Sequence, residues 1–235
     1  MKLGVNIDHI ATLRNARGGV EPSILEAAKI ALKEDILALT MHLREDRRHI
    51  KDEDLWDVKR LGAKINLEMA ATSEIQKIAL ELKPYSVCIV PERREEVTTE
   101  GGLDVEGQIE YLKDFIKPLK EAGILVSMFI DPDSEQVKAS SYIGADYIEM
   151  HTGCFAHAFE NGDFSFELER LKSAAKLAQS LGLKVNAGHG LNYQNVYLMK
   201  EIEGLCELNI GHSIISRAVF DGLQSSISLM LELIK

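Results

Sequence analysis

The chain has 235 residues, of which 46% are hydrophobic and 27% are charged, and this composition excludes intrinsic disorder and the fibrous classes. Its formal net charge of -10 disfavours nucleic acid as the main partner, because backbone phosphates select for broad basic surfaces. Phosphorylated small molecules stay open as ligands, since they need only a local basic cluster.

The first residues and the cysteines predict a protein that stays in the cytoplasm. No run approaches the roughly 18 apolar residues of a membrane helix, and the start MKLGVNIDH carries charge where a signal peptide needs apolar residues. Cys88, Cys154 and Cys206 are odd in number and lack CxxC spacing, which argues against disulfides and a structural zinc site. We therefore expect reduced thiols and no membrane partner.

Short β-branched and apolar runs alternate with stretches of helical period, a pattern typical of a parallel sheet built from βαβ units. The expected helices cover residues 21–33, 52–61, 73–82, 105–121, 134–143, 165–181, 193–203 and 215–234. The expected strands cover residues 3–8, 36–41, 64–69, 86–90, 125–130, 147–150, 184–187 and 207–210.

Eight parallel strands can close into a barrel, and a doubly wound open sheet is the competing architecture. The polar residues at the strand ends favour the barrel. No linker or change of composition divides the chain. We therefore expect residues 1–235 to form a single-domain (β/α)8 TIM barrel with short extra helices in its loops.

The ends of the predicted strands carry most of the polar side chains suited to catalysis. In (β/α)8 barrels the active site is built from the C-terminal ends of the strands and the loops after them. A lone histidine at a strand end is more often structural, but all seven histidines fall on this rim, which favours a concave catalytic site. The rim residues are Asp8, His9, His42, His49, Glu68, Glu92, Asp131, Glu149, His151, His157, His189 and His212.

Three clusters of arginine follow predicted strands one, two and four, on the same rim. Arg17 and Arg44 are the favoured phosphate ligands, because the guanidinium binds phosphate through a planar fork. Arg47 and Arg48 lie among acids in HLREDRRHI and fit a solvated surface network equally well. The remaining cluster residues are Arg14, Arg93 and Arg94.

Two glycine-containing loops and one long polar loop complete the predicted rim. The loops AGHGLN and NIGHSIIS would let backbone amides approach a phosphate at a helix start near Ser213. The loop PERREEVTTEGGLD fits either a lid that closes over substrate, with Thr98 and Thr99 as contacts, or a disordered surface loop.

The positions of the lysines bear on how an imine would form. An aldolase that uses an enzyme Schiff base needs a lysine at a strand's C-terminal end. Lys64 and Lys184 sit at strand starts instead, so any imine would form between substrates. The sequence has neither GxGxxG nor GxxxxGK[ST], so we expect no nucleotide cofactor.

Several long motifs resemble those of the pyridoxine 5'-phosphate synthase family, in the family's order and along the whole chain. They are GVNIDHIATLRNARGG (4–19), HLREDRRHI (42–50), NLEMA (66–70), VTTEGGLDVEGQ (97–108), FIDPD (129–133), IEMHTGC (148–154), KVNAGHGLNYQNV (184–196) and ELNIGHSIISRAV (207–219).

The resemblance implies a transferase-class reaction and assigns roles to residues. It implies that 3-amino-2-oxopropyl phosphate condenses with 1-deoxy-D-xylulose 5-phosphate to give pyridoxine 5'-phosphate, phosphate and two waters. The reaction would use neither a metal nor a cofactor and would take place in a cytoplasmic homo-octamer. His42 and Glu68 would be proton acceptors, His189 the proton donor, and Glu149 would stabilise a transition state. Asn6, Asp8, His9, Arg44, His49 and Thr98 would bind the deoxyxylulose phosphate, and Arg17, Gly190, Gly211 and His212 the amino ketone phosphate or the product.

Two other functions stay open from the residues alone. Histidines and carboxylates on a barrel rim also suit a metal-dependent sugar-phosphate epimerase. A non-catalytic binder of phosphorylated metabolites would need the arginines, but not both Glu68 and His189.

Overall fold

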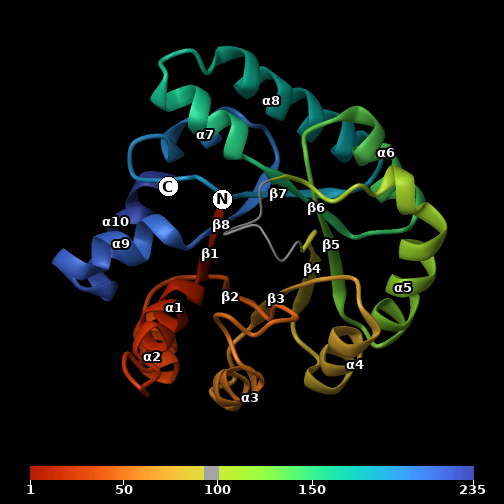
Figure 1. Ribbon diagram of the computed structural model, residues 1–235. Helices are drawn as coiled ribbons and strands as arrows, with labels where there is room; N and C mark the ends of the chain where they lie inside the picture. The colour runs from red at the N-terminus through yellow and green to blue at the C-terminus, as the bar shows by residue number, and fades with distance from the viewer. Residues whose placement is uncertain (93–100) are drawn as a thin grey trace.

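The protein is described by a computed structural model that covers residues 1–92 and 101–235. Eight parallel strands close into a barrel in chain order, with helices packed around them (Figure 1). Because β1 pairs with β8, the sheet has no free edge, which confirms the barrel and rules out the open sheet. The strands are β1 (Lys2–Asn6), β2 (Ala38–His42), β3 (Ile65–Met69), β4 (Ser86–Ile89), β5 (Leu125–Ile130), β6 (Tyr147–His151), β7 (Lys184–Gly188) and β8 (Leu205–Ile210).

Helices follow the strands, and several lie in the loops at the rim. Among the described residues no helix is long and apolar enough to cross a membrane. The helices are α1 (Asp8–Arg17), α2 (Ile24–Ala31), α3 (Asp52–Arg60), α4 (Ser73–Leu82), η1 (Glu106–Gln108), α5 (Ile109–Glu121), α6 (Ser134–Tyr142), α7 (Gly153–Glu160), α8 (Ser165–Ser180), η2 (Val196–Glu201), α9 (His212–Asp221) and α10 (Leu223–Ile234).

The structure corrects three of the expected elements. The first strand ends at Asn6, and Asp8 begins helix α1 instead of ending the strand. The helix expected over 193–203 is only the 3₁₀ segment η2, because the side chains of Asn192 and Asn195 bond to each other's backbone amides and compete with helical bonds. The last expected helix is two helices, since Gly222 between them has a φ of 80°.

Each strand presents two chemically different faces. In β3, Ile65, Leu67 and Met69 join the main apolar core, which also contains Leu55 and Ile75 of the surrounding helices. Because successive side chains of a strand point to opposite faces, the alternate positions of β3 face the interior of the barrel. These positions are polar, as they are in most strands, so the apolar core lies between the sheet and the helices. The inward polar side chains include Thr40, His42, Asn66, Glu68, Ser127, Glu149, His151, Asn186, Glu207 and Asn209.

A buried ion pair fixes α1 beside the loop that follows β2. Both terminal nitrogens of Arg14 donate to the carboxylate of Asp54, at 2.6 and 2.9 Å, and one also reaches the carbonyl of His49. Asp54 also accepts the backbone N–H of Lys51 at 2.9 Å, which caps α3. Arg14, counted by the sequence among the phosphate-binding clusters, is therefore a structural residue.

Replacing this arginine is expected to destabilise the fold. The change Arg14→Leu leaves the carboxylate of Asp54 buried without its partner, and should lower the free energy of unfolding by about 3 kcal/mol. The double variant Arg14→Leu/Asp54→Asn should recover part of the loss, because no charge is then left buried. Urea denaturation measures both, and equal losses in the two variants would contradict the role given to the pair.

Candidate active site

Polar side chains from the ends of β1, β2 and β3 meet at the C-terminal opening of the barrel. Asp8, His42 and Glu68 bring their ligand atoms within 4.8 Å of one another. One oxygen of Asp8 accepts the backbone N–H of His42 at 2.9 Å, and the other accepts the amide of Asn6 at 2.8 Å. This cluster has the composition of an acid–base site, and its donor atoms would also suit a divalent cation.

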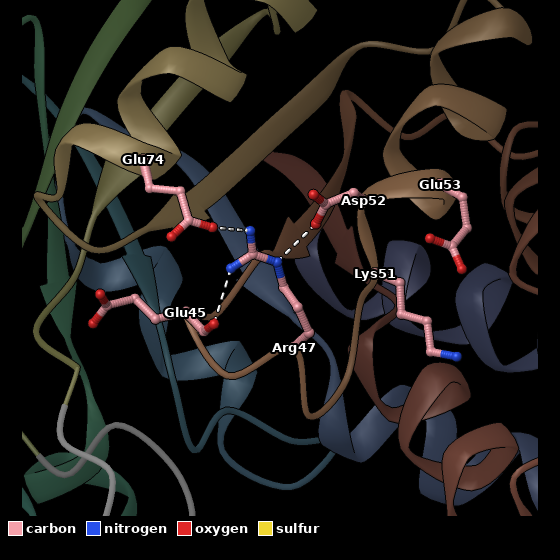
Figure 2. Close-up of a pocket in the computed structure, with 6 residues that line it drawn as sticks. All are labelled: Glu45, Arg47, Lys51, Asp52, Glu53 and Glu74. Carbon is pink, nitrogen blue, oxygen red and sulfur yellow. Dashed lines mark hydrogen bonds and ion pairs between the residues drawn. The ribbon is translucent and has the colours of Figure 1, made fainter.

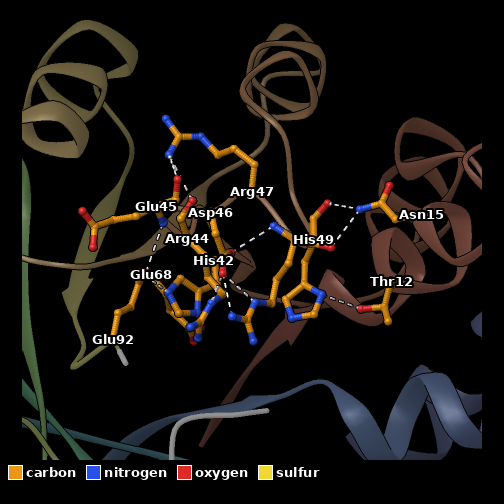
Figure 3. Close-up of polar contacts among 11 residues, drawn as sticks. Thr12, Asn15, His42, Arg44, Glu45, Asp46, Arg47, His49, Glu68 and Glu92 are labelled. Carbon is orange, nitrogen blue, oxygen red and sulfur yellow. Dashed lines mark hydrogen bonds and ion pairs between the residues drawn. The ribbon is translucent and has the colours of Figure 1, made fainter. Parts of the chain in front are cut away.

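His42 lies between two carboxylates, as Figure 3 shows. Its Nε2 is 2.8 Å from Oε1 of Glu92, and its Nδ1 is 3.8 Å from Oε2 of Glu68. Although burial opposes it, the hydrogen bond with His42 lowers the pKa of Glu92. The hydrogen bond with Glu92 fixes the imidazole, and its other nitrogen faces Glu68 at a distance too long for a direct hydrogen bond.

The carboxyl groups of the cluster are desolvated and close together. Burial raises the pKa of Glu68 well above its ordinary value, and the charges of Asp8 and Glu149 raise it further. Burial likewise raises the pKa of Asp8, against the opposing effect of His42. A carboxylate with a raised pKa is a stronger base near neutral pH, so Glu68 is suited to accept a proton.

Glu149 lies inside the barrel, on β6. Its Oε2 accepts the amide of Asn209 at 2.7 Å and lies 3.7 Å from the sulfur of Cys88. Burial raises the pKa of Glu149 to about 7. This carboxyl can therefore be neutral or charged near neutral pH, as a group that stabilises a changing charge requires.

A pair of histidines lies on the opposite side of the opening, at the ends of β6 and β7. The rings of His151 and His189 are 5.0 Å apart, and Nδ1 of His151 is 2.9 Å from Oδ1 of Asp131. His189 has a φ of 78°, a left-handed conformation that is uncommon for a residue with a side chain. Burial, with the nearby His151, lowers the pKa of His189 to about 4.

Three further histidines, His9, His49 and His212, lie around the start of α9. The ring of His9 lies 5.0 Å from that of His212 and 6.5 Å from that of His49. Nδ1 of His49 is 2.8 Å from the hydroxyl of Thr12. Burial is the main cause that lowers the pKa of His49 to about 4 and lowers that of His9. Gly211 caps α9, and a Cβ on it would lie 2.8 Å from that of Asn6.

Two of the three arginines that follow His42 have different surroundings. The side chain of Arg44 is buried, only 4% exposed, and its Nε lies 3.7 Å from Asp46 (Figure 3). Arg47 lines a surface pocket, where its guanidinium bonds Asp52 at 2.7 Å and Glu74 at 2.5 Å (Figure 2). Arg47 therefore belongs to a surface ion-pair network, as one of the two sequence interpretations expected.

The structure leaves some expected rim residues away from these groups. Arg17 is exposed in the last turn of α1, roughly 13 Å along the helix axis from Asp8. His157 is exposed on α7 and bonds Asn161. Gly190, in contrast, directly follows His189, and a Cβ on it would lie 2.7 Å from that of Ala156. Four residues of the predicted site lie outside the described ranges: Arg93, Arg94, Thr98 and Thr99.

The polar side chains deeper in the barrel were not singled out from the sequence. Thr40, Asn66 and Asn209 are buried and bond to one another or to Glu149. A signal was present, because strands of a parallel barrel usually read as continuous apolar runs, whereas ALTMH, INLEM and LCELNI have polar residues at alternate positions.

Comparison with known proteins gives relatives along the whole chain. Residues 3–235 match the family model described as Pyridoxal phosphate biosynthesis protein PdxJ. The pyridoxine 5'-phosphate synthase of Sulfurihydrogenibium sp. is 57% identical over 238 residues, covering 100% of this chain and 98% of the relative. The pyridoxine 5'-phosphate synthase of Geobacter sulfurreducens is 57% identical over 235 residues, with the same coverage.

Solved structures with little sequence similarity share the fold. A 3-hexulose-6-phosphate synthase superposes with a TM-score of 0.64 at 16% identity, covering 100% of both chains. The phosphoribosyl anthranilate isomerase of Thermus thermophilus has a TM-score of 0.60 at 12% identity, covering 99% of this chain and 100% of that one. These likenesses concern the barrel alone.

Ionisation inside the barrel is expected to make stability depend on pH. Burial raises the pKa of Glu207 to about 8, from an ordinary value of 4.5. Between these values the folded protein keeps a proton that the unfolded chain releases, so stability falls as pH rises. Relative to wild type, Glu207→Gln should therefore gain about 3 kcal/mol in free energy of unfolding between pH 5 and pH 8.

Urea denaturation of this variant and of wild type at both pH values measures the effect. The control is Glu26→Gln, which removes an exposed carboxylate paired with Lys29 and should change little with pH. An equal effect of Glu207→Gln at pH 5 and pH 8 would contradict the expectation.

Proposed function

The chain belongs to the family of the pyridoxal phosphate biosynthesis protein PdxJ and is an enzyme of vitamin B6 biosynthesis, and we propose that it works as a pyridoxine 5'-phosphate synthase. It condenses 3-amino-2-oxopropyl phosphate with 1-deoxy-D-xylulose 5-phosphate, giving pyridoxine 5'-phosphate, phosphate and two waters. The observation that supports this most directly is the grouping of His42 with Glu68, whose pKa is raised by burial and by the charges of Asp8 and Glu149.

In this proposal the cluster at the opening moves protons during condensation. Imine formation, loss of water and ring closure each need proton transfers, which a histidine and a carboxyl of raised pKa can perform near neutral pH. Glu68 and His42 accept protons from the substrates. Glu149, with a pKa of about 7, stabilises charge that develops on the ring-forming intermediate.

His189 is the proposed proton donor, and it needs the substrate to act. Its lowered pKa, about 4, leaves the free imidazole neutral at neutral pH. A phosphate bound beside it would raise that pKa, because an opposite charge favours the protonated form. Binding of a phosphorylated substrate would thus supply the acid for the steps that expel water.

Two groups of residues are proposed to hold the substrates. Asn6, Asp8 and Arg44 would bind 1-deoxy-D-xylulose 5-phosphate together with His9, His49 and Thr98. The amino ketone phosphate or the product would lie at the start of α9, where free backbone amides favour an anion. The residues proposed there are Gly190, Gly211 and His212, with Arg17 added from the family motif.

The imine is proposed to form between the two substrates, without an enzyme lysine. Lys184 is the first residue of β7 and exposed, at the end of the barrel opposite the site. The metal-dependent epimerase, whose cation Asp8, His42 and Glu68 could ligate, is not supported, because the relatives are named as synthases. The non-catalytic binder is not supported for the same reason.

We further propose that residues 1–235 form one catalytic domain that assembles as a cytoplasmic homo-octamer and uses no cofactor. Support for assembly comes from α9, where Val219 and Phe220 are 69% and 87% exposed. Large apolar side chains exposed side by side are suited to contact another subunit.

The change Glu68→Gln tests the catalytic assignment. It keeps the shape of the side chain but removes the base, so it should lower kcat by about a hundredfold or more. Pyridoxine 5'-phosphate and inorganic phosphate are followed together from the two purified ketone phosphates. The matched control is Glu74→Gln, which affects a surface carboxylate bonded to Arg47 and should leave kcat unchanged. No product from folded wild type would reject the function itself.

Replacing Arg44 and Arg47 separately tests the phosphate site. Lysine lacks the planar fork of arginine, so Arg44→Lys should raise the KM for 1-deoxy-D-xylulose 5-phosphate about tenfold. The same change at Arg47, whose charge is matched by Asp52 and Glu74, should alter that KM less than about twofold. Steady-state kinetics compare the two, and equal effects would show that Arg44 has no special part in binding.

A further inference from the structure

Five polar side chains inside the barrel form one row of hydrogen bonds that ends on Glu149. The hydroxyl of Ser86 donates to Oδ1 of Asn66 at 2.8 Å, and Nδ2 of Asn66 donates to the hydroxyl oxygen of Thr40 at 3.4 Å. The hydroxyl of Thr40 donates to Oδ1 of Asn209 at 2.8 Å. Nδ2 of Asn209 then donates to Oε2 of Glu149 at 2.7 Å.

Every donor in this row points toward Glu149. The oxygen of Thr40 receives a hydrogen from Asn66, so its own hydrogen is directed at Oδ1 of Asn209. With its oxygen occupied in this way, the amide of Asn209 must turn its nitrogen to Glu149. The orientation of this amide is thus set by Thr40, and the orientation of Thr40 by the residues before it.

The row crosses strand β1 because Gly4 has no side chain. Gly4 is the register partner of Asn209 on β8 and of Ala38 on β2, so β1 separates the two strands that the row connects. A Cβ on Gly4 would overlap Oδ1 of Asn209. The glycine therefore lets Asn209 reach over β1 to Thr40.

The two oxygens of Glu149 have different surroundings as a result. Oε2 receives the amide of Asn209 and lies near the thiol of Cys88. Oε1 lies against Gly188, the last residue of β7 and the neighbour of His189, where a Cβ would come within 2.5 Å of it. An N–H donor against Oε2 leaves no room for a proton there, so the proton of a neutral Glu149 belongs on Oε1.

We propose that Asn209, oriented by Thr40, is a positioning residue that reserves one oxygen of Glu149 as an acceptor and leaves the other, Oε1, to exchange the proton. This inference rests on the proposed function, in which Glu149 stabilises a transition state. The bond from Asn209 also opposes the effect of burial on Glu149, since it favours the charged carboxylate.

The direct test is the titration of Glu149, measured without substrate. Infrared spectroscopy follows its carboxyl band against pH, and Glu149→Gln identifies the band. The change Asn209→Leu removes the donor, so the pKa of Glu149 should rise by about one unit. Thr40→Val should shift it in the same direction by less, while Thr40→Ser keeps the hydroxyl and should match wild type.

Kinetics provide the second readout. Asn209→Leu and Thr40→Val should lower kcat, the former by about tenfold, and move the pH limb set by Glu149, with KM values within about twofold of wild type. If both variants fold and leave the titration of Glu149 unchanged, the inference is wrong. It is also wrong if Thr40→Ser behaves like Thr40→Val, because the effect would then come from packing and not from the hydroxyl.

A further variant, Gly4→Ala, tests the inference if Asn209→Leu does not fold. Gly4→Ala changes none of the five side chains of the row, but its methyl group would displace the amide of Asn209 and come 2.7 Å from Oε1 of Glu207, so the pKa of Glu149 should rise again. An unchanged titration in folded Gly4→Ala would overturn the inference. Wild type that forms no product would reject the proposed function, whereas the substrate-free titration would still decide the positioning role.

Discussion

Desolvation of carboxyl groups inside a closed barrel is the constraint on which the site depends. Asp8, Glu68 and Glu149 all have their pKa values raised by burial, which brings their proton exchange toward neutral pH. The closed sheet makes this burial possible, because the apolar core lies outside it, against the helices. The outward side chains of the strands form the apolar core that stabilises the fold, and the inward side chains carry the polar groups of the site.

The sequence predicted the barrel and its rim because both depend on local patterns. Apolar runs marked the strands, and His42 and Glu68 were found because they stand at strand ends, where barrels place their sites. Helix α1 was not among the expected helices. One of its buried positions is an arginine, Arg14, and burial of that residue depends on Asp54, 40 residues away. No local pattern reports such a pairing.

Side-chain direction inside the barrel was equally beyond the sequence. The polar alternation of β2 and β8 marks Thr40 and Asn209 as inward-facing, but their bond joins residues 169 positions apart in the chain. The separate surroundings of Arg44 and Arg47 are another example. The two residues are three positions apart in one loop, yet one guanidinium is buried and the other belongs to a surface ion-pair network. Tertiary packing decides such cases, and composition does not.

The pairing of β1 with β8 also has a consequence for the synthesis of the protein on the ribosome. Strand β1 can pair with β8 only after residues near 210 have left the exit tunnel, because Gly4 pairs with Asn209. The raised pKa values of Glu68 and Glu149 are therefore a property of the complete ring, because the burial that causes them requires all eight strands.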